Sequence, residues 1–162
     1  ILRESSEWGS GMKTGSARGM ALHESFGTIC GTVAEVTISG AGDLSVDRIV
    51  SAVDCGNLVN PQTARMQVES GIVYGLSAAL HGKMTVENGQ VLEDNFDTYE
   101  VLRLAGTPEM EAHFVESAGG KWGGLGEPSL PPVAPAVCNA VFSITGRRIR
   151  ALPIGDYLLM PA

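Results

Sequence analysis

The sequence predicts an α+β domain in which a mixed or antiparallel sheet of hairpins packs with two main helices. Three observations lead to this fold class. Two strand-like stretches flank a glycine turn at residues 40–43, and an Asn-Gly pair at residues 88–89 marks a second hairpin. Helical apolar spacing occupies Pro61–His81 and Pro132–Thr145. With 162 residues and 44% hydrophobic composition, the chain is of single-domain size and can bury one core.

Charge and hydropathy exclude several classes of partner. The 18 acidic and 11 basic residues give a net charge of −7, which argues against nucleic acid and against an anionic membrane surface. No apolar stretch approaches the ~20 residues of a membrane span, so none is predicted. We see no targeting signal, which leaves both the cytoplasm and the periplasm open.

The first residues are expected to stand apart from the domain. Residues 1–4 resemble the end of a helix whose beginning is missing, and residues 5–16 are polar and glycine-containing without periodicity. We therefore expect residues 1–17 to be a flexible linker or the remnant of an upstream helix, and residues 18–162 to form the domain. Because the sequence also lacks an initial methionine, we expect it to be a fragment of a longer protein.

The first hairpin and the first helix have the clearest local signals. Residues 31–39 and 44–53 form the hairpin, and Asn60 and Pro61 then supply the N-cap and first-position proline of a helix ending near Gly82. Along this helix Val68, Ile72 and Leu76 make an apolar stripe that faces the core.

A second stripe on the same helix is nearly bare of side chains. Gln67, Gly71, Gly75 and Ala79 recur every four residues, so one amide heads a face made of glycine and alanine. Each helical glycine is about 0.8–1 kcal/mol less favourable than alanine, so the two glycines require a compensating contact. Tight packing against another backbone is the simpler interpretation of the glycines. Gln67 is a candidate for hydrogen bonding a planar polar ligand.

The remaining elements are predicted from shorter patterns. Residues 84–87 and 90–93 form the second hairpin, residues 112–117 alternate as a strand, and residues 149–154 would be a last strand. Cys30, Cys55 and Cys138 are far apart and include no Cys-x-x-Cys pair, so no zinc or iron–sulfur site is predicted within the chain. They are expected to be small buried residues in a reducing compartment.

One carboxylate lies in the most glycine-dense stretch of the chain. Glu127 follows Gly126 within residues 119–128 and precedes the second main helix, for which Ser129 is a candidate cap. The N-terminus of that helix would favour a carboxylate nearby. Two interpretations are open at this point: Glu127 is a functional acid, or it caps the helix while the glycines turn the chain.

Several motifs together resemble the C-terminal part of the molybdenum-binding large subunit of the xanthine dehydrogenase and aldehyde oxidase family. They are Gly-Gly-Leu-Gly-Glu-Pro at residues 123–128, Pro-Pro-Val-Ala-Pro-Ala at 131–136, Val-Asp-Cys-Gly at 53–56, Gln-Val-Glu at 67–69 and Tyr-Gly-Leu-Ser-Ala-Ala-Leu at 74–80. The sequences of these motifs most resemble those of the isoquinoline 1-oxidoreductase branch. Ser70 departs from the glycine expected after Gln-Val-Glu.

The resemblance implies a fold, a reaction and roles for four residues. It implies the hydroxylation of an aldehyde or an N-heteroaromatic substrate, with water as the oxygen source, at a molybdenum–pyranopterin cofactor. Glu127 matches the general base toward the molybdenum-bound hydroxyl. Gln67 matches the glutamine that approaches the pterin, and Gly71 and Gly126 lie beside it as cofactor-binding residues. Metal ligands within the chain are not expected, because the pterin ligates the metal.

The resemblance also implies partners that this chain does not contain. These are the remainder of the large subunit, which carries the other half of the pterin cradle, and iron–sulfur clusters on a small subunit or another domain. A small aldehyde or N-heterocycle would be the substrate, and the isolated chain would be inactive. The alternative from another class is a non-catalytic packing or assembly domain of a larger oxidoreductase, in which the glycine loop is only an interface.

Overall fold

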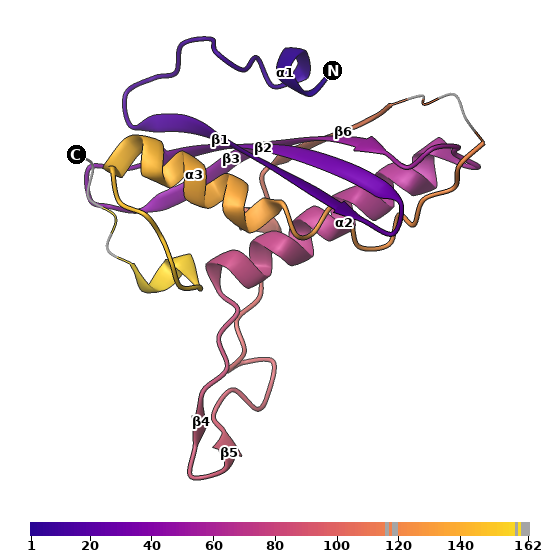
Figure 1. The fold of residues 1–162 in the computed structure, drawn as a ribbon. Helices are drawn as coiled ribbons and strands as arrows, with labels where there is room; N and C mark the ends of the chain where they lie inside the picture. The colour runs from indigo at the N-terminus through magenta and orange to yellow at the C-terminus, as the bar shows by residue number, and fades with distance from the viewer. Residues whose placement is uncertain (116, 118–119, 158, 160–162) are drawn as a thin grey trace.

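The computed structural model describes residues 1–115, 117, 120–157 and 159. Its elements, coloured along the chain in Figure 1, are α1 (Leu2–Ser5), β1 (Ser16–Ser25), β2 (Thr28–Ile38), β3 (Leu44–Asp54), α2 (Pro61–Leu80), β4 (Val86–Glu87), β5 (Gln90–Val91), the 3-10 turn η1 (Leu104–Gly106), β6 (Glu109–Phe114), α3 (Val133–Thr145) and the 3-10 turn η2 (Ile154–Asp156). Both predicted main helices and both predicted hairpins are present.

A four-stranded mixed sheet forms the centre of the fold, with strand order β1-β2-β3-β6. β1, β2 and β3 are antiparallel neighbours, whereas β6 pairs in parallel with β3. A parallel pair needs a crossover connection, and α2 provides it. The fold class is therefore α+β with a mixed sheet, as the sequence predicts.

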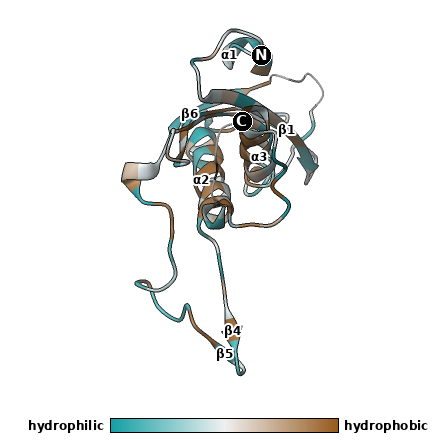
Figure 2. Cartoon of the chain, turned by 90° about the vertical axis from the view of Figure 1, so that its left-hand side faces the viewer, coloured by the Kyte–Doolittle hydropathy of each residue, from teal (hydrophilic) through white to brown (hydrophobic). Residues whose placement is uncertain are grey.

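The sheet lies between two unequal layers. α2 and α3 cover one face, and the short α1 lies over the other (Figures 1 and 2). The predicted stripe of Val68, Ile72 and Leu76 is fully buried against the sheet. α3 approaches β1 so closely that a Cβ at Gly19 would overlap the backbone of Ala136 and Ala140. Glycine is required at this strand position because a backbone approaches it.

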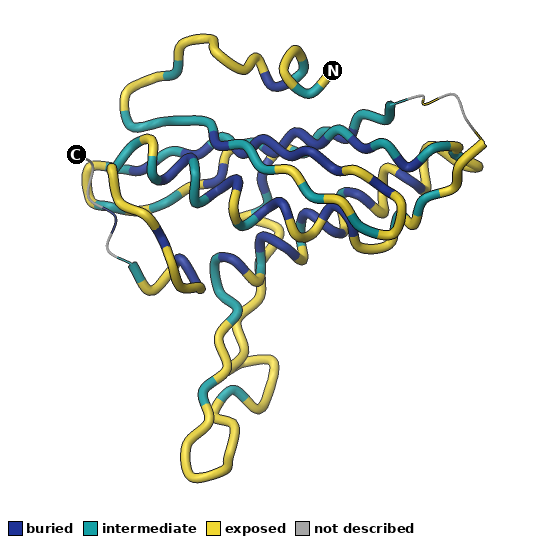
Figure 3. The backbone as a smooth tube through the Cα atoms, viewed as in Figure 1, coloured by how far each residue is buried: buried dark blue, intermediate teal, exposed yellow. Residues whose placement is uncertain are grey.

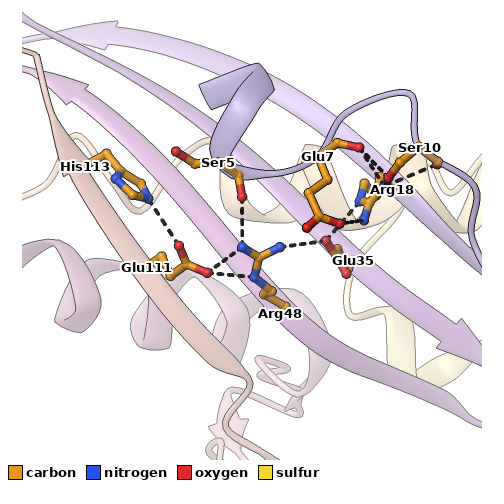
Figure 4. Close-up of polar contacts among 8 residues, drawn as sticks. All are labelled: Ser5, Glu7, Ser10, Arg18, Glu35, Arg48, Glu111 and His113. Atoms are coloured by element: carbon orange, nitrogen blue, oxygen red, sulfur yellow. Dashed lines mark hydrogen bonds and ion pairs between the residues drawn. The ribbon is translucent and has the colours of Figure 1, made fainter. Parts of the chain in front are cut away.

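The N-terminal segment is attached to the outer face of the sheet by charged side chains (Figure 4). Arg48 on β3 donates to the main-chain oxygen of Ser5 at 2.8 Å, and Arg18 on β1 donates to the main-chain oxygen of Glu7 at 2.9 Å. Glu35 on β2 accepts from both arginines, at 2.9 and 3.0 Å. The boundary that we predict between residues 17 and 18 stays a prediction, although the segment before it contacts the sheet.

Two sequence predictions about strands need correction. The predicted strand at 112–117 begins earlier, as β6 at Glu109, and residue 116 lies outside the described part. The predicted strand at 149–154 is wrong: this segment is irregular and leads into η2. Ile149 and Ile154 are buried, while Arg150 and Leu152 are exposed. The apolar pattern therefore reflects two separate anchors on the core, and Pro153 removes a donor that a strand would need.

The described residues contain no membrane-spanning helix, metal-binding cluster or disulfide bond. None of the helices described is long and apolar enough to cross a membrane. The part of the chain that the structure describes also contains no group of three His, Cys, Asp or Glu side chains placed to bind a metal ion. Cys30, Cys55 and Cys138 are free thiols, the first two buried and the third half-buried, and burial raises the pKa of each.

Candidate functional site

The glycine loop, residues 120–127, is held across the ends of two strands. The amide of Gly123 donates to the main-chain oxygen of Cys55, just after β3, at 2.8 Å. The amide of Gly124 donates to that of Phe26, in the turn before β2, at 2.9 Å. Thr28 completes the attachment, because its hydroxyl donates to the main-chain oxygen of Gly124 at 2.6 Å. The loop is thus fixed by segments about 70 and 100 residues earlier in the chain.

These close approaches explain why the loop is rich in glycine. A Cβ at Gly123 would overlap the Thr28 hydroxyl, and a Cβ at Gly56 would overlap the main-chain oxygen of Lys121. Gly56 also has a φ of +78°, which L-residues with side chains rarely adopt. Glycine at both positions lets two backbones touch.

Gln67 connects the loop to α2. Asn60 caps this helix through its side chain, which accepts from the amide of Thr63 at 3.0 Å, as predicted. Two turns along, the exposed Gln67 donates through Nε2 to the main-chain oxygen of Gly126 at 2.9 Å. One N–H bond and the Oε1 acceptor of the amide have no partner among the described residues. Two of the predicted site residues, Gln67 and Gly126, are therefore in direct contact.

The bare face of α2 packs against the continuation of the loop. A Cβ at Gly71 would overlap Oγ of Ser129, and one at Gly75 would lie 2.6 Å from the main-chain oxygen of Leu130. The compensating contact expected for the two glycines is this segment, so tight packing against another backbone is the correct interpretation of them. Gly71 is buried beneath Ser129.

Ser129 does not cap α3, contrary to the prediction. The helix begins at Val133 with Pro132 as its N-cap, and no side chain caps it. Ser129 lies three residues earlier in a turn closed by the amide of Leu130, which donates to the main-chain oxygen of Glu127 at 2.9 Å. It is 2% exposed, and its hydroxyl has no hydrogen-bond partner within the described residues.

Glu127 lies at the outer end of this arrangement. Its neighbours Pro128 and Ser129 are buried, whereas Glu127 itself is exposed. Its carboxylate makes no hydrogen bond or ion pair with the residues that the structure describes, although its main chain is held by Leu130 and lies next to the Gln67–Gly126 contact. The site therefore presents one unpaired carboxylate on a backbone that is fixed at both sides.

A hollow of about 340 Å³ lies between the glycine loop and the first turns of α2. Gln67, Gly126, Trp122, Cys55 and Asn57 contribute to its lining, and Glu127 lies just outside it. A catalytic Glu127 would be expected in a concavity near the face of α2 made by Gly71 and Gly75. The structure instead covers that face with Ser129 and Leu130 and places the hollow one turn earlier on the helix.

Several contributors were missed by the sequence reasoning. Phe26 holds the loop from the β1–β2 turn, and Thr28 holds it from the first position of β2. Asn57 donates from both its amide and its side chain to the main-chain oxygen of Lys121, at 3.2 and 3.3 Å. Asn57 follows Gly56 directly, so its place after a strand end was a usable signal. Phe26 and Thr28 had no such signal, because their contact spans almost 100 residues.

The chain is similar in sequence to one protein family and to several known enzymes. The family described as "Molybdopterin cofactor-binding domain" matches residues 2–108. The chain is 34% identical over 153 residues to isoquinoline 1-oxidoreductase subunit beta of Brevundimonas diminuta, which covers 94% of this chain and 19% of that protein. It is 37% identical over 123 residues to a membrane-bound aldehyde dehydrogenase of Gluconacetobacter polyoxogenes, covering 75% of this chain and 16% of that protein.

Solved structures share the fold. Quinoline 2-oxidoreductase from Pseudomonas putida 86 superposes with a TM-score of 0.70 at 22% identity, over 78% of this chain and 17% of that one. Aldehyde oxidoreductase from Desulfovibrio gigas gives a TM-score of 0.68 at 24% identity, over 78% and 14%. A third relative, aldehyde oxidoreductase molybdenum-binding subunit PaoC of Escherichia coli, is 30% identical over 181 residues, covering 93% of this chain and 25% of that protein. The chain thus spans between about one sixth and one quarter of the length of these three relatives.

Proposed function

Since this chain belongs to the family of molybdopterin cofactor-binding domains, we propose that it forms one wall of a molybdenum hydroxylase site within a longer large subunit. The relatives named as isoquinoline 1-oxidoreductase and aldehyde oxidoreductase subunits support this class of enzyme. The substrate would be an aldehyde or an N-heteroaromatic compound, hydroxylated with water as the oxygen source. Alone, the chain would be inactive, because it offers one wall of the site.

The residues present fit such a cofactor. A Cβ at Gly126 would meet no atom within 4 Å, so the backbone there is open to a ligand. The free Oε1 and the second N–H of Gln67 can accept from and donate to a planar polar group such as a pterin edge. The molybdenum–pyranopterin cofactor would supply the redox chemistry; this chain would supply hydrogen bonds from Gln67 and close backbone approach at Gly126.

In this proposal Gly71 acts on the cofactor indirectly, through the turn that packs against it. Its missing side chain lets Ser129 lie directly on α2, and Ser129 is two residues from Glu127. Any side chain at Gly71 would push this turn outward. Gly71 therefore positions the segment that carries Gly126 and Glu127.

Glu127 would serve as the general base. A general base must be ionised and able to reach the proton it accepts, which here belongs to the hydroxyl group derived from water. The observation that carries the assignment is the unpaired, exposed carboxylate next to the Gln67–Gly126 contact. Its carboxylate has no partner among the described residues, so it stays available to a ligand held by Gln67 and Gly126.

The proposal includes partners outside these residues. The remaining large subunit would complete the pterin cradle and the substrate pocket. Iron–sulfur clusters on a small subunit or another domain would accept the electrons. The alternative is a non-catalytic packing domain, in which Glu127 would have no role, and the variant described next separates the two.

The test is the Glu127→Gln variant of the full-length assembled enzyme. Loss of a general base typically lowers the rate by about 10²–10⁴-fold, so we expect turnover to fall in that range while molybdenum content stays normal. Glu109→Gln, at an exposed position on β6, is the matched control and should keep normal turnover. Near-normal turnover of Glu127→Gln with full molybdenum would remove the base assignment.

A further inference from the structure

The segment between α2 and η1 projects away from the rest of the molecule as an arm, defined here as residues 83–101 (Figure 1). It leaves the body at the C-terminal end of α2 and returns there. Its tip is the two-stranded ribbon of β4 and β5, joined by a turn in which Asn88 and Gly89 have φ values of +50° and +80°. Positive φ at both turn residues is the geometry of a tight type I′ hairpin.

Local polar contacts give the arm a defined shape. The hydroxyl of Thr85 donates to Glu93 at 2.9 Å, its amide donates to the same carboxylate, and the amide of Leu92 donates to the main-chain oxygen of Thr85 at 2.9 Å. Further along, the amides of Thr98 and Tyr99 donate to the main-chain oxygen of Asn95. The arm is thus an ordered ribbon and turn without a core of its own.

The apolar side chains of the arm have no cover. The structure describes every residue of the arm, and none is buried (Figure 3). Six large apolar side chains are between 40% and 94% exposed: Met84, Val86, Val91, Leu92, Phe96 and Val101. Scattered single exposures are ordinary, but a group of this size on one short segment marks an interaction site.

The free energy of ordering the arm also indicates that another surface covers it. An isolated two-stranded hairpin is only marginally stable in water. Each large apolar side chain that leaves water contributes about 1.5–3 kcal/mol. The exposed apolar side chains can therefore offset the conformational entropy lost on ordering the arm only when another surface covers them.

The charge of the arm restricts the kind of surface. It carries five carboxylates, at Glu87, Glu93, Asp94, Asp97 and Glu100, against one cation. That cation, Lys83, pairs with Asp156 of the body at 2.9 Å. Asp94 and Asp97 flank Phe96, the most exposed of the apolar side chains. A complementary surface would combine an apolar groove with lysine or arginine side chains along its edge.

We propose that the arm docks into an apolar groove edged with lysine or arginine side chains, on the part of the parent large subunit that lies outside these 162 residues. The inference rests on the proposed function, because it assumes that longer subunit. The aligned 123, 153 and 181 residues make up 16%, 19% and 25% of the three curated relatives, so these proteins are roughly five times as long as this chain and most of their polypeptide is available to form such a groove. The arm would fasten this domain to its neighbour.

The place of the arm separates it from the candidate site. Gln67 lies near the start of α2, and the arm leaves the helix at its opposite end. From Gln67 to Leu80, at the end of α2, the helix rises by about 20 Å at 1.5 Å per residue. The arm therefore acts on assembly, and its variants should alter how much cofactor-loaded protein forms without altering turnover per molybdenum.

Photo-crosslinking of the full-length protein tests the proposal. With p-benzoylphenylalanine in place of Phe96, we expect cross-linked peptides from the same subunit, outside the 162 residues and containing lysine or arginine. Oxidative footprinting of the unsubstituted protein is the second measurement. Met84 and Phe96 should be oxidised about tenfold more slowly in the folded than in the urea-unfolded protein.

The outcomes separate the docking proposal from its alternatives. Cross-links to a second copy, to an iron–sulfur subunit or back to this domain would overturn it, as would footprinting rates equal to those of the unfolded protein. Asp94→Lys with Asp97→Lys should lower the cross-linking yield more than Asp94→Asn with Asp97→Asn, and equal yields would contradict the basic edge. Molybdenum analysis of the same sample tests the proposed function independently. A docked arm without bound molybdenum would contradict the proposed function and leave the docking proposal intact.

Discussion

The contact between Gly71 and Ser129 determines how closely the loop approaches α2. The serine hydroxyl occupies the space where a Gly71 side chain would lie, and it has no hydrogen-bond partner among the described residues. Burying an unpaired hydroxyl costs free energy, so the close packing must repay it. The same contact holds the turn that begins at Glu127 and is closed by the amide of Leu130.

Gly71→Ala should destabilise the protein. Alanine would gain about 0.8–1 kcal/mol of helix propensity, but the overlap with Ser129 should cost about 1–3 kcal/mol, so we expect a net loss of free energy of unfolding. Denaturant unfolding measures it. In the double variant Gly71→Ala with Ser129→Ala, the overlapping oxygen is absent, and most of the loss should be recovered. Additive losses in the two variants would show that the contact is not the cause.

At the scale of the elements, charged side chains tie four strands together across the outer face of the sheet. Arg48 of β3 donates through Nε to Glu111 of β6 at 2.8 Å and through Nη1 to Glu35 of β2, which also accepts from Arg18 of β1 (Figure 4). The second oxygen of Glu111 lies 3.2 Å from Nε2 of His113. This network connects the parallel strand β6 to the antiparallel hairpins, and only the folded sheet brings these residues together.

Glu111 should make stability depend on pH at acidic values. The hydrogen bond from Arg48, with a smaller contribution from His113, holds the pKa of the Glu111 carboxyl below its ordinary value, although partial burial opposes the shift. Because the folded pKa is lowered, this contribution is fully present above the ordinary glutamate pKa and is lost as the pH falls through the lowered one.

The measurement is thermal or urea unfolding as a function of pH. The partly exposed pair should contribute less than about 1 kcal/mol, and Glu111→Gln should flatten the acid limb by that amount. Glu109→Gln on the same strand should keep the wild-type slope. An acid limb that is unchanged in Glu111→Gln would exclude this carboxyl as its source.

At the scale of the whole molecule, the sheet has a cover on each face. α2 and α3 bury the core on one side, while residues 1–10 lie across the other. Val33 and Val50, which pair across β2 and β3, are fully buried on the same face as Glu35 and Arg48. Leu2 reaches this face too, because a Cβ at Gly31 would lie 2.9 Å from its side chain. The N-terminal segment thus completes a second, smaller layer.

Removal of residues 1–12 should therefore lower stability. Uncovering Val33 and Val50 exposes apolar surface worth about 1.5–3 kcal/mol for each fully exposed side chain, so we expect a loss of a few kcal/mol in urea unfolding. Leu2→Ala should cost less, since it removes one contact only. An unchanged unfolding midpoint after the truncation would instead support the prediction that residues 1–17 are a linker.

How much the sequence could predict depends on the range of each signal. Asn60 and Pro61 begin α2 through contacts within one turn, and Asn-Gly closes the second hairpin in the same local way, so both were predicted correctly. Ser129 was wrongly predicted as a cap because it lies in the turn before α3, packed on Gly71, which is 58 residues away in the chain. The expected strand at 149–154 failed because its two isoleucines are buried separately.

The sequence by itself determined the α+β fold class, the two main helices, both hairpins and the glycine loop around Glu127, because each is encoded by short-range spacing or backbone preference. Only the tertiary structure decided that Gln67 holds Gly126, that Phe26 and Cys55 fix the loop, and that the glycine face of α2 is covered by Ser129. The reason is physical: these contacts join segments far apart in the chain, and chain closure over such distances is set by how the whole sheet and its helices pack.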